Sequence, residues 1–165
     1  MGAIRVHHLN CGTMHPASRR LTNGTGGLFT AATLVCHCLL VETGQSLVLI
    51  DTGFGTRDAE DPVGSLGRRF LRLTRPELDP RESAVRQVIR LGYQPTDVRH
   101  IVLTHLDPDH TGGISDFPWA TVHLHARDGS ASRRYAGSPA CLRRSCRFPS
   151  PGTAVGTPVW LWTRA

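Results

Sequence analysis

Lysine is missing from this 165-residue chain, whose 19 basic side chains are all arginine. Lysine codons are AT-rich and most arginine codons are not, so this bias indicates a GC-rich coding sequence. Aromatic residues make up only 6% of the chain, and no apolar run approaches the roughly 20 residues of a membrane-spanning helix. The first residues also lack the apolar centre of a secretory signal. We therefore expect a cytoplasmic protein without a membrane partner.

Acidic residues are missing after Asp128. Residues 129–165 hold six arginines and no Asp or Glu, whereas residues 1–128 hold 13 arginines and 13 acidic groups. The whole net charge of +6 therefore belongs to the last segment. A pI near 9.7 would ordinarily favour nucleic acid or a membrane surface as a partner. Because this segment has neither interleaved aromatics nor an amphipathic period, we expect no nucleic acid partner.

The chain has five cysteines. Because this number is odd, the cysteines cannot all be paired in disulfides within the chain. This usage fits a reducing compartment. Cys36 and Cys38 flank His37 within an apolar run, which permits a metal-binding interpretation. We expect instead that both cysteines are small buried strand residues, since no second ligand pair lies at zinc-finger spacing and free cysteine packs as a compact hydrophobe.

One segment concentrates side chains that bind metals. His105, Asp107, Asp109 and His110 place two imidazoles and two carboxylates within six positions, directly after the apolar run 101–103. A single His or Asp at a strand end is usually a solvated turn residue. Four such groups in one tight loop instead indicate a site for a divalent cation such as zinc, manganese or iron.

This segment resembles the HxHxDH signature of the metallo-β-lactamase fold, whose members include lactonases, thioesterases, β-lactamases and phosphodiesterases. Upstream, residues 46–53 resemble that family's strand ending in an Asp-Thr-Gly turn, and the resemblance covers about residues 4–128. One position departs from the signature, because Asp107 stands where its second histidine is expected. Flavodiiron proteins in the family carry a carboxylate there, so Asp107 remains a candidate ligand.

The resemblance implies a metal-dependent hydrolase with two divalent metals per site, either zinc or, because of Asp107, iron or manganese. His105 and Asp107 would hold the first metal, and Asp109 and His110 the second. A bound cation lowers the pKa of a coordinated water from about 15.7 toward about 7. Asp109, as the catalytic residue, would orient that water and take up a proton. The implied substrate is a small molecule with an ester, lactone, thioester or amide-like bond.

The family's remaining ligands are missing from the chain. A later Gly-His segment, a bridging Asp and a final His normally complete the site, and none can be found after Asp128. His123 and His125 alternate with apolar residues, so they are expected on one half-solvated strand face rather than at the metal. The alternative to an active hydrolase is therefore a catalytically inactive remnant with a partial metal site.

The last segment permits a test on paper. If GC-rich codons are chosen for residues 151–165 and translation begins one nucleotide earlier, the peptide becomes PGHCRGHTGVAVDTG, which resembles the missing Gly-His segment of the family. We therefore expect residues from about Gly129 onward to be a frameshifted or mis-joined translation of a longer metallohydrolase. The alternative is a genuine flexible extension rich in Pro, Gly and Ser.

The hydrophobic pattern predicts an α/β domain, which the resemblance makes part of an αββα sandwich, mainly its N-terminal half. Strands are expected over residues 4–9, 34–41, 46–51, 100–104 and 120–125. A helix is expected to begin after Asp79 and to end at Gly92. Residues 1–128 would form this incomplete domain, and residues 129–165 an irregular tail in a non-native frame or disordered. One sheet face would then stay uncovered, which predicts poor solubility or a partner chain.

Overall fold

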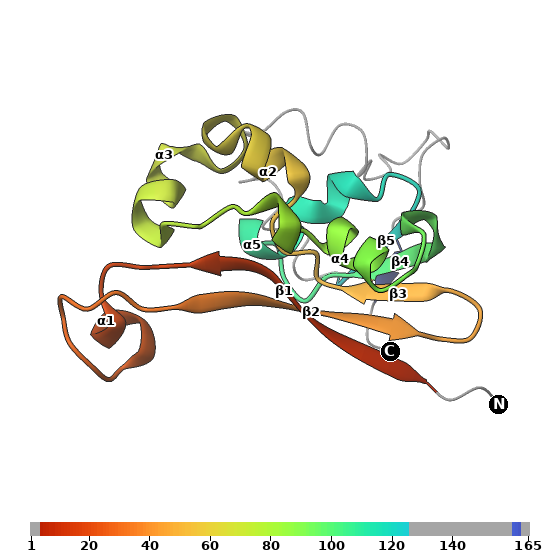
Figure 1. The fold of residues 1–165 in the computed structure, drawn as a ribbon, viewed down its shortest axis with the longest axis horizontal. Coiled ribbons are helices and arrows are strands. Elements are labelled where there is room, and N and C mark those ends of the chain that lie inside the picture. Colours follow the sequence, from red (N-terminus) through yellow and green to blue (C-terminus); the bar gives the residue numbers. More distant parts are fainter. Residues whose placement is uncertain (1–3, 126–159, 163–165) are drawn as a thin grey trace.

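The computed structural model describes residues 4–125 and 160–162, which form a single mixed β-sheet with helices packed against it (Figure 1). The strands follow one another across the sheet in the order of the sequence. The first three are antiparallel neighbours, and β3 to β6 run parallel. Their bounds are β1 Arg5–Met14, β2 Leu34–Glu42, β3 Leu47–Ile50, β4 Val98–Val102, β5 Thr121–His125 and β6 Trp160–Trp162. The expected α/β class is confirmed.

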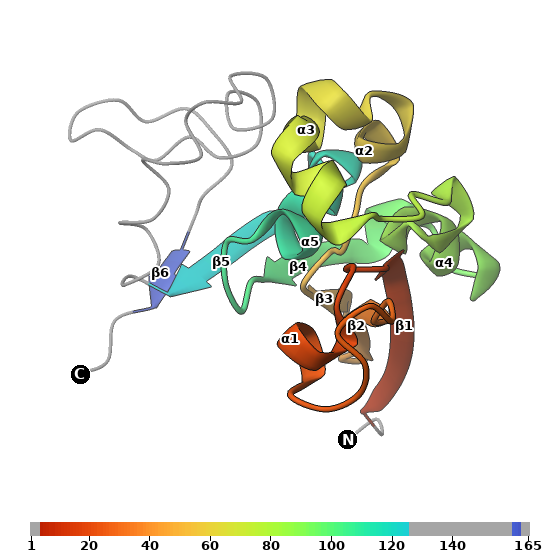
Figure 2. The ribbon, with the colours of Figure 1, turned by 90° about the vertical axis from the view of Figure 1, so that its left-hand side faces the viewer.

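The helices fill the connections between these strands. They are α1 Arg19–Asn23, α2 Thr56–Glu60, α3 Pro62–Thr74, α4 Ala84–Arg90 and α5 Pro108–Thr111, with short 3-10 turns at η1 Pro80–Glu82, η2 Pro95–Asp97 and η3 Gly112–Asp116. Helices α2 to α5 lie on one side of the twisted sheet, and α1 lies apart from them in the loop between β1 and β2 (Figure 2). None of the helices in the described part of the chain is long and apolar enough to cross a membrane.

Alternation along the strands divides the sheet into two faces. One face packs its apolar side chains against α4 and η3, and these residues are almost fully buried; they include Leu40, Leu49, Ile101, Val122, Ala84, Val88 and Phe117. Period-two geometry sends every second strand residue to this face. The main core of the protein therefore lies between the sheet and the helices that cover it.

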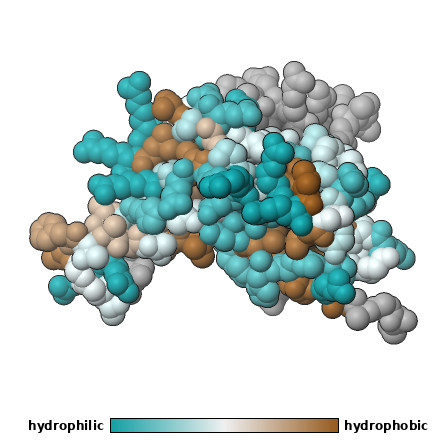
Figure 3. All heavy atoms as spheres, viewed as in Figure 1, coloured by the Kyte–Doolittle hydropathy of each residue, from teal (hydrophilic) through white to brown (hydrophobic). Residues whose placement is uncertain are grey.

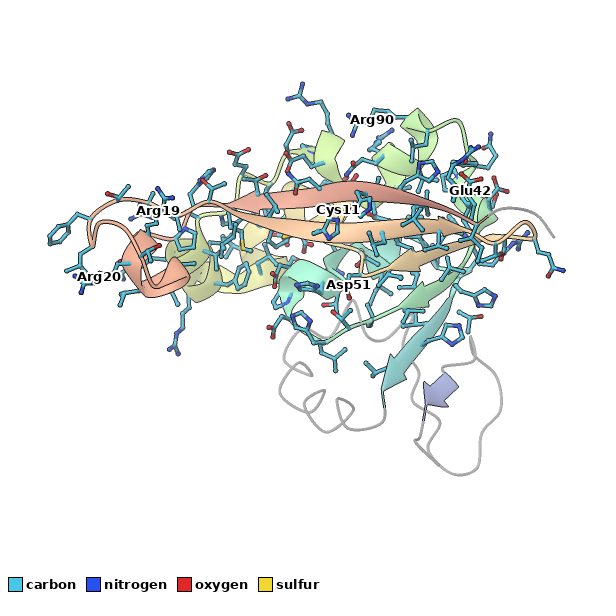
Figure 4. The ribbon with its side chains drawn as sticks, turned by 90° about the horizontal axis from the view of Figure 1, so that it is seen from below. Cys11, Arg19, Arg20, Glu42, Asp51 and Arg90 are labelled. Atoms are coloured by element: carbon cyan, nitrogen blue, oxygen red, sulfur yellow. The ribbon has the colours of Figure 1, made fainter. Side chains whose placement is uncertain are left out.

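The opposite face, which we call the open face, is half-buried or exposed. Its strand residues are Val6, His8, Asn10, Val35, His37, Leu39, Val41, Val48, Ile50, His100, Val102, Thr121 and His123. Val35 is 56% exposed and Val102 is 38% exposed. Figure 4, which views the protein from below, looks toward this face of β1 to β3. The predicted uncovered sheet face is thus present in the described part of the chain.

The element boundaries differ from the predictions at particular turns. The helix expected after Asp79 is divided, because Ser83 adopts an extended backbone (φ −57°, ψ 142°) between η1 and α4. Strand β1 extends to Met14, past an irregularity in its pairing between Asn10 and Thr13. Helices α2 and α3 were not expected, although Asp61 followed by Pro62 is a helix-start signal, and the Asp61 side chain accepts a hydrogen bond from Gly64 N.

The loop between β1 and β2 carries solvent-exposed apolar side chains. Phe29 is 99% exposed and Leu21 is 81% exposed. Hydrophobic side chains gather at the tip of this projection in the surface view (Figure 3). They provide an exposed apolar surface away from the open face.

Candidate metal centre

A buried carboxylate at the end of β3 anchors the candidate site. The Asp51 side chain accepts hydrogen bonds from the backbone N–H of Thr104 (2.9 Å) and from its hydroxyl (2.7 Å). Asp51 is only 4% exposed and has a left-handed backbone (φ 56°), which Asp tolerates better than most residues. It lies beside α5 in Figure 4. Asp51 therefore fixes the backbone where the chain leaves β4 and enters the loop 104–110.

The next two residues hold the far end of the same loop. Thr52 donates from its backbone N–H and from its hydroxyl to the carbonyl of His110, both at 2.9 Å. The backbone N–H of Gly113 lies 3.1 Å from both the Thr52 hydroxyl and the Gly53 carbonyl. The Asp-Thr-Gly turn therefore holds the loop 104–110 through specific hydrogen bonds at both of its ends.

The four predicted metal-binding side chains come together in this loop. The rings of His105 and His110 have centroids 3.8 Å apart. His105 Nε2 lies 3.4 Å from Asp107 Oδ2, and His110 Nε2 lies 3.5 Å from Asp109 Oδ2. Asp107 is the most exposed of the four, at 68% of its side chain. The arrangement is two His–Asp pairs joined through the contact between their imidazoles.

The burial of His110 tests whether these groups suit a cation. Its Nδ1 atom lies 3.0 Å from Asp51 Oδ2, but this contact lacks hydrogen-bond geometry, and Nδ1 is buried without a hydrogen-bond partner in the described chain. A buried polar atom normally has a partner, so this nitrogen and the imidazole and carboxylate donors beside it fit a bound divalent cation. Within residues 4–125 and 160–162, however, no three His, Cys, Asp or Glu side chains converge on one metal position. The described residues therefore form an incomplete candidate for a metal centre.

Two further carboxyls that sequence reasoning missed support the loop from behind. Asp58 accepts hydrogen bonds from Gly55 N (2.8 Å) and from the Ser65 hydroxyl, and a Cβ atom on Gly112 would collide with it. Asp116 accepts from Thr56 N (3.0 Å) and from its hydroxyl (2.5 Å). Burial raises the pKa of both carboxyls against the lowering effect of these hydrogen bonds. The sequence signal that could have pointed to Asp58 was its position three residues after Gly55, which is the spacing of a capping box.

The predictions for the other histidines and cysteines can also be compared with the structure. Cys36 and Cys38 are buried and free, as expected, and burial raises the pKa of the Cys36 thiol. His37 lies on the open face, opposite to them. His123 is half-buried on the same open face, also as expected, and burial lowers its pKa. The side chain of His125 lies outside the described residues.

A comparison with protein families matches residues 31–139 to the metallo-beta-lactamase superfamily. The matched region includes the Asp-Thr-Gly turn and the whole loop 104–110, and it extends beyond Asp128.

Curated relatives carry hydrolase names. A protein of Mycobacterium tuberculosis named "Probable metallo-hydrolase" is 50% identical over 145 residues, which are 88% of this chain and 41% of the relative. An N-acyl homoserine lactonase of Rhizobium radiobacter is 34% identical over 139 residues, 84% of this chain and 51% of that protein. The chain thus spans about half the length of these relatives.

Solved structures share the fold. An N-acyl homoserine lactone hydrolase with N-hexanoyl-L-homoserine at its catalytic metal centre aligns with a TM-score of 0.66 at 23% identity, covering 81% of this chain and 53% of that one. A dizinc quorum-quenching lactonase aligns with a TM-score of 0.55 at 15% identity, covering 94% of this chain and 61% of that one. At these identities the likeness establishes the fold alone.

Proposed function

Because the chain belongs to the metallo-β-lactamase superfamily, we propose that it is a metal-dependent hydrolase that cleaves an ester, lactone, thioester or amide-like bond in a small molecule. One observation carries this proposal: two His–Asp pairs meet in a loop whose two ends are held by hydrogen bonds with the turn after β3. Such a rigid support is what a metal site requires of its ligands.

Each side chain of the loop has a role in this proposal. His105 and Asp107 would hold one divalent metal, and Asp109 and His110 would hold a second. The metal would be zinc, or iron or manganese because of the added carboxylate of Asp107. When bound, the metal supplies a hydroxide nucleophile at neutral pH and polarises the oxygen of the bond to be cleaved. Asp109, which is 21% exposed, orients the attacking water and takes up its proton on a carboxylate oxygen.

The lactone class is the first substrate class to test. The supporting observation is that relatives at 34% identity and structural neighbours are named N-acyl homoserine lactonases or hydrolases. Lactones, esters and thioesters share a carbonyl carbon that accepts a hydroxide, so the loop chemistry alone does not choose among them. A panel of N-acyl homoserine lactones, simple esters and thioesters separates these possibilities.

Metal analysis and hydrolysis assays on the purified full chain test the proposal. An active hydrolase should hold about two metals per chain in the loop 104–110, counted as the ions lost when His105 and His110 are both replaced by Ala, and His110→Ala and Asp109→Asn should each lower hydrolysis at least about 100-fold. His15→Gln is a matched control, because His15 is an exposed histidine paired with Glu77. The inactive-remnant alternative predicts substoichiometric metal that chelators remove readily and no hydrolysis above that of the Asp109→Asn variant. This outcome would overturn the enzymatic proposal.

Residues 129–165 bear on that alternative. We propose that this basic segment contains a change of reading frame, which removed the histidines that the family resemblance implies for the rest of the site. Its support is the loss of all acidic residues after Asp128. The family match as far as residue 139 favours a change after that residue over one at Gly129. Sequencing the gene across codons 125–165 tests this: if the codons for Gly152-Thr153 and Gly156-Thr157 contain no His codon in the neighbouring frame, the idea fails.

We also propose a cytoplasmic location without nucleic acid or membrane partners. Its support is that Cys11, Cys36 and Cys38 are free thiols, which persist in a reducing compartment. Fractionation of cells expressing the full-length protein from its own gene tests this, and recovery in the membrane or extracellular fraction would contradict it.

A further inference from the structure

The described histidines divide into two groups of four according to their partners. His7, His15, His105 and His110 each lie beside a carboxylate. The remaining four lie on the open face and pair with one another across neighbouring strands: His8 with His37, and His100 with His123. No carboxylate lies within ion-pairing distance of these four side chains in the described part of the chain. Among the described residues, imidazole pairs without a neighbouring carboxylate are therefore a feature of the open face.

Strand register produces both pairs. His8 lies opposite Leu39 and His37 lies opposite Asn10, so these two histidines are diagonal neighbours on β1 and β2. The other pair has the same relation on β4 and β5, where Val102 lies opposite His123. Diagonal neighbours on one sheet face are within reach of each other's side chains. Each pair is consequently held by two hydrogen-bonded strands and not by a loop.

The distance within each pair suits two ligands of one metal ion. His8 Nδ1 lies 3.0 Å from His37 Nε2, and His100 Nδ1 lies 3.1 Å from His123 Nε2. Two imidazole nitrogens bound to one ion at about 2.05 Å are about 3.3 Å apart in tetrahedral geometry and about 2.9 Å apart at right angles. The observed separations fall between these values, so small rotations of the rings would aim both lone pairs at one ion.

The surroundings keep these imidazoles available. No Asp or Glu stands among the open-face positions of the described strands, and Arg99, beside His100 on β4, is exposed. Neutral imidazole is the form that binds metals. Because His100 and His123 are half-buried, an ion between them would also be partly shielded from water.

We propose that the open face is a second metal-binding surface, separate from the loop 104–110, on which the His8–His37 pair and the His100–His123 pair each chelate one borderline divalent ion such as Zn²⁺, Ni²⁺ or Cu²⁺. Water molecules complete the coordination of each ion. The proposal does not depend on hydrolase activity, because none of its four ligands belongs to the loop. The competing interpretation is that each pair is only an N–H···N hydrogen bond between neutral rings.

Calorimetric titration of the metal-free full chain with Ni²⁺ tests the proposal. Two double variants, His8→Gln with His37→Gln and His100→Gln with His123→Gln, remove one pair each while keeping the loop. Each double variant should bind one ion fewer per chain than the unchanged protein, and a single His→Gln should weaken its own site at least about tenfold by breaking the chelate. His15→Gln is the matched control and should bind the same number of ions as the unchanged protein.

A second measurement locates the ions. After two equivalents of Zn²⁺ per chain have been added to fill the loop 104–110, a small amount of Cu²⁺ should broaden the imidazole NMR signals of the two pairs, while the His7 and His15 signals remain sharp. Unchanged ion counts in both double variants, or an equal loss in the His15→Gln control, would overturn the proposal. Circular dichroism of every variant verifies that the sheet has formed, so that a lost site is not confused with a lost fold.

Discussion

The carboxylate of Asp51 connects the turn after β3 with Thr104 at the start of the loop and with His110 at its end. It is buried, it accepts two hydrogen bonds from Thr104, and it lies 3.0 Å from His110 Nδ1. Hydrogen bonds to a charged group contribute about 1.5–3 kcal/mol each. Asn has nearly the same shape and tolerates the same left-handed backbone, so Asp51→Asn isolates the charge of this side chain.

We expect Asp51→Asn to lower the free energy of unfolding by about 2 kcal/mol and to weaken metal binding by the loop about 10- to 100-fold. Urea unfolding and metal titration measure the two effects. Asp97→Asn is the matched control, because Asp97 is an exposed carboxylate that accepts one hydrogen bond from Gln94 N. Equal effects in the two variants would show that the position of Asp51 in the site is unimportant.

Asp58 predicts how stability depends on pH. Burial raises its pKa above the ordinary value of 3.8, so the folded state binds the proton more tightly than the unfolded state does. The part of the free energy of unfolding that depends on Asp58 therefore falls as the pH rises from 3.8 through the raised pKa. In Asp58→Asn this decrease in the free energy of unfolding should be absent, since an amide does not ionise.

Urea unfolding at a series of pH values measures the effect for the unchanged protein and for Asp58→Asn. The variant should show a flatter pH dependence in that window; Asp116, whose pKa is also raised by burial, accounts for part of the fall that remains. A variant with the same slope as the unchanged protein would contradict the assignment.

At the scale of elements, β1 and the turn after β3 approach each other closely at Gly53. A Cβ atom there would collide with the side chain and the carbonyl of Cys11, and the backbone has φ 64°. Phe54 N also donates to the Cys11 carbonyl at 2.9 Å. This contact sets the position of the turn whose Thr52 and Gly53 hold the loop 104–110.

Gly53→Ala should therefore destabilise the protein by about 3 kcal/mol, the sum of left-handed strain and steric overlap, and should weaken metal binding at the loop. Gly44→Ala is its control, because Gly44 has φ 80° and open space around it; it should cost only the strain of about 1–2 kcal/mol. Thermal or urea unfolding compares them. Similar losses at both positions would mean that the close approach to Cys11 does not matter.

At the scale of the whole molecule, the open face of the described strands combines exposed or half-buried apolar side chains with four histidines and carries no Asp or Glu. Val35, Ile50 and Val102 are half-buried or exposed there, and apolar patches of this kind promote association. Replacing Val35 and Val102 with Ser should reduce the binding of the dye 1-anilinonaphthalene-8-sulfonate to the protein. The same variant should sediment more as a monomer than the unchanged protein does in sedimentation velocity.

Phe29→Ser is the comparison, because Phe29 is 99% exposed on the projecting loop and lies away from the open face. If Phe29→Ser abolishes association and the double variant leaves it unchanged, the projecting loop and not the open face drives self-association.

The sequence by itself determined the features that depend on neighbours along the chain. The loop 104–110 carries its four candidate ligands within six positions, so no knowledge of distant contacts was needed to find them. The strand pattern likewise placed Cys36 and Cys38 in the core and His123 on the half-buried face, because alternation fixes which face a side chain meets.

The tertiary structure decided everything that joins distant segments. Thr52 and His110, Thr56 and Asp116, and the two histidine pairs are brought together by strand order, register and turn packing. Alternation assigns a face but not a neighbour, since each strand can slide in register or change its place in the sheet. The supporting carboxyls and the histidine pairs therefore became visible only once the strands were placed side by side.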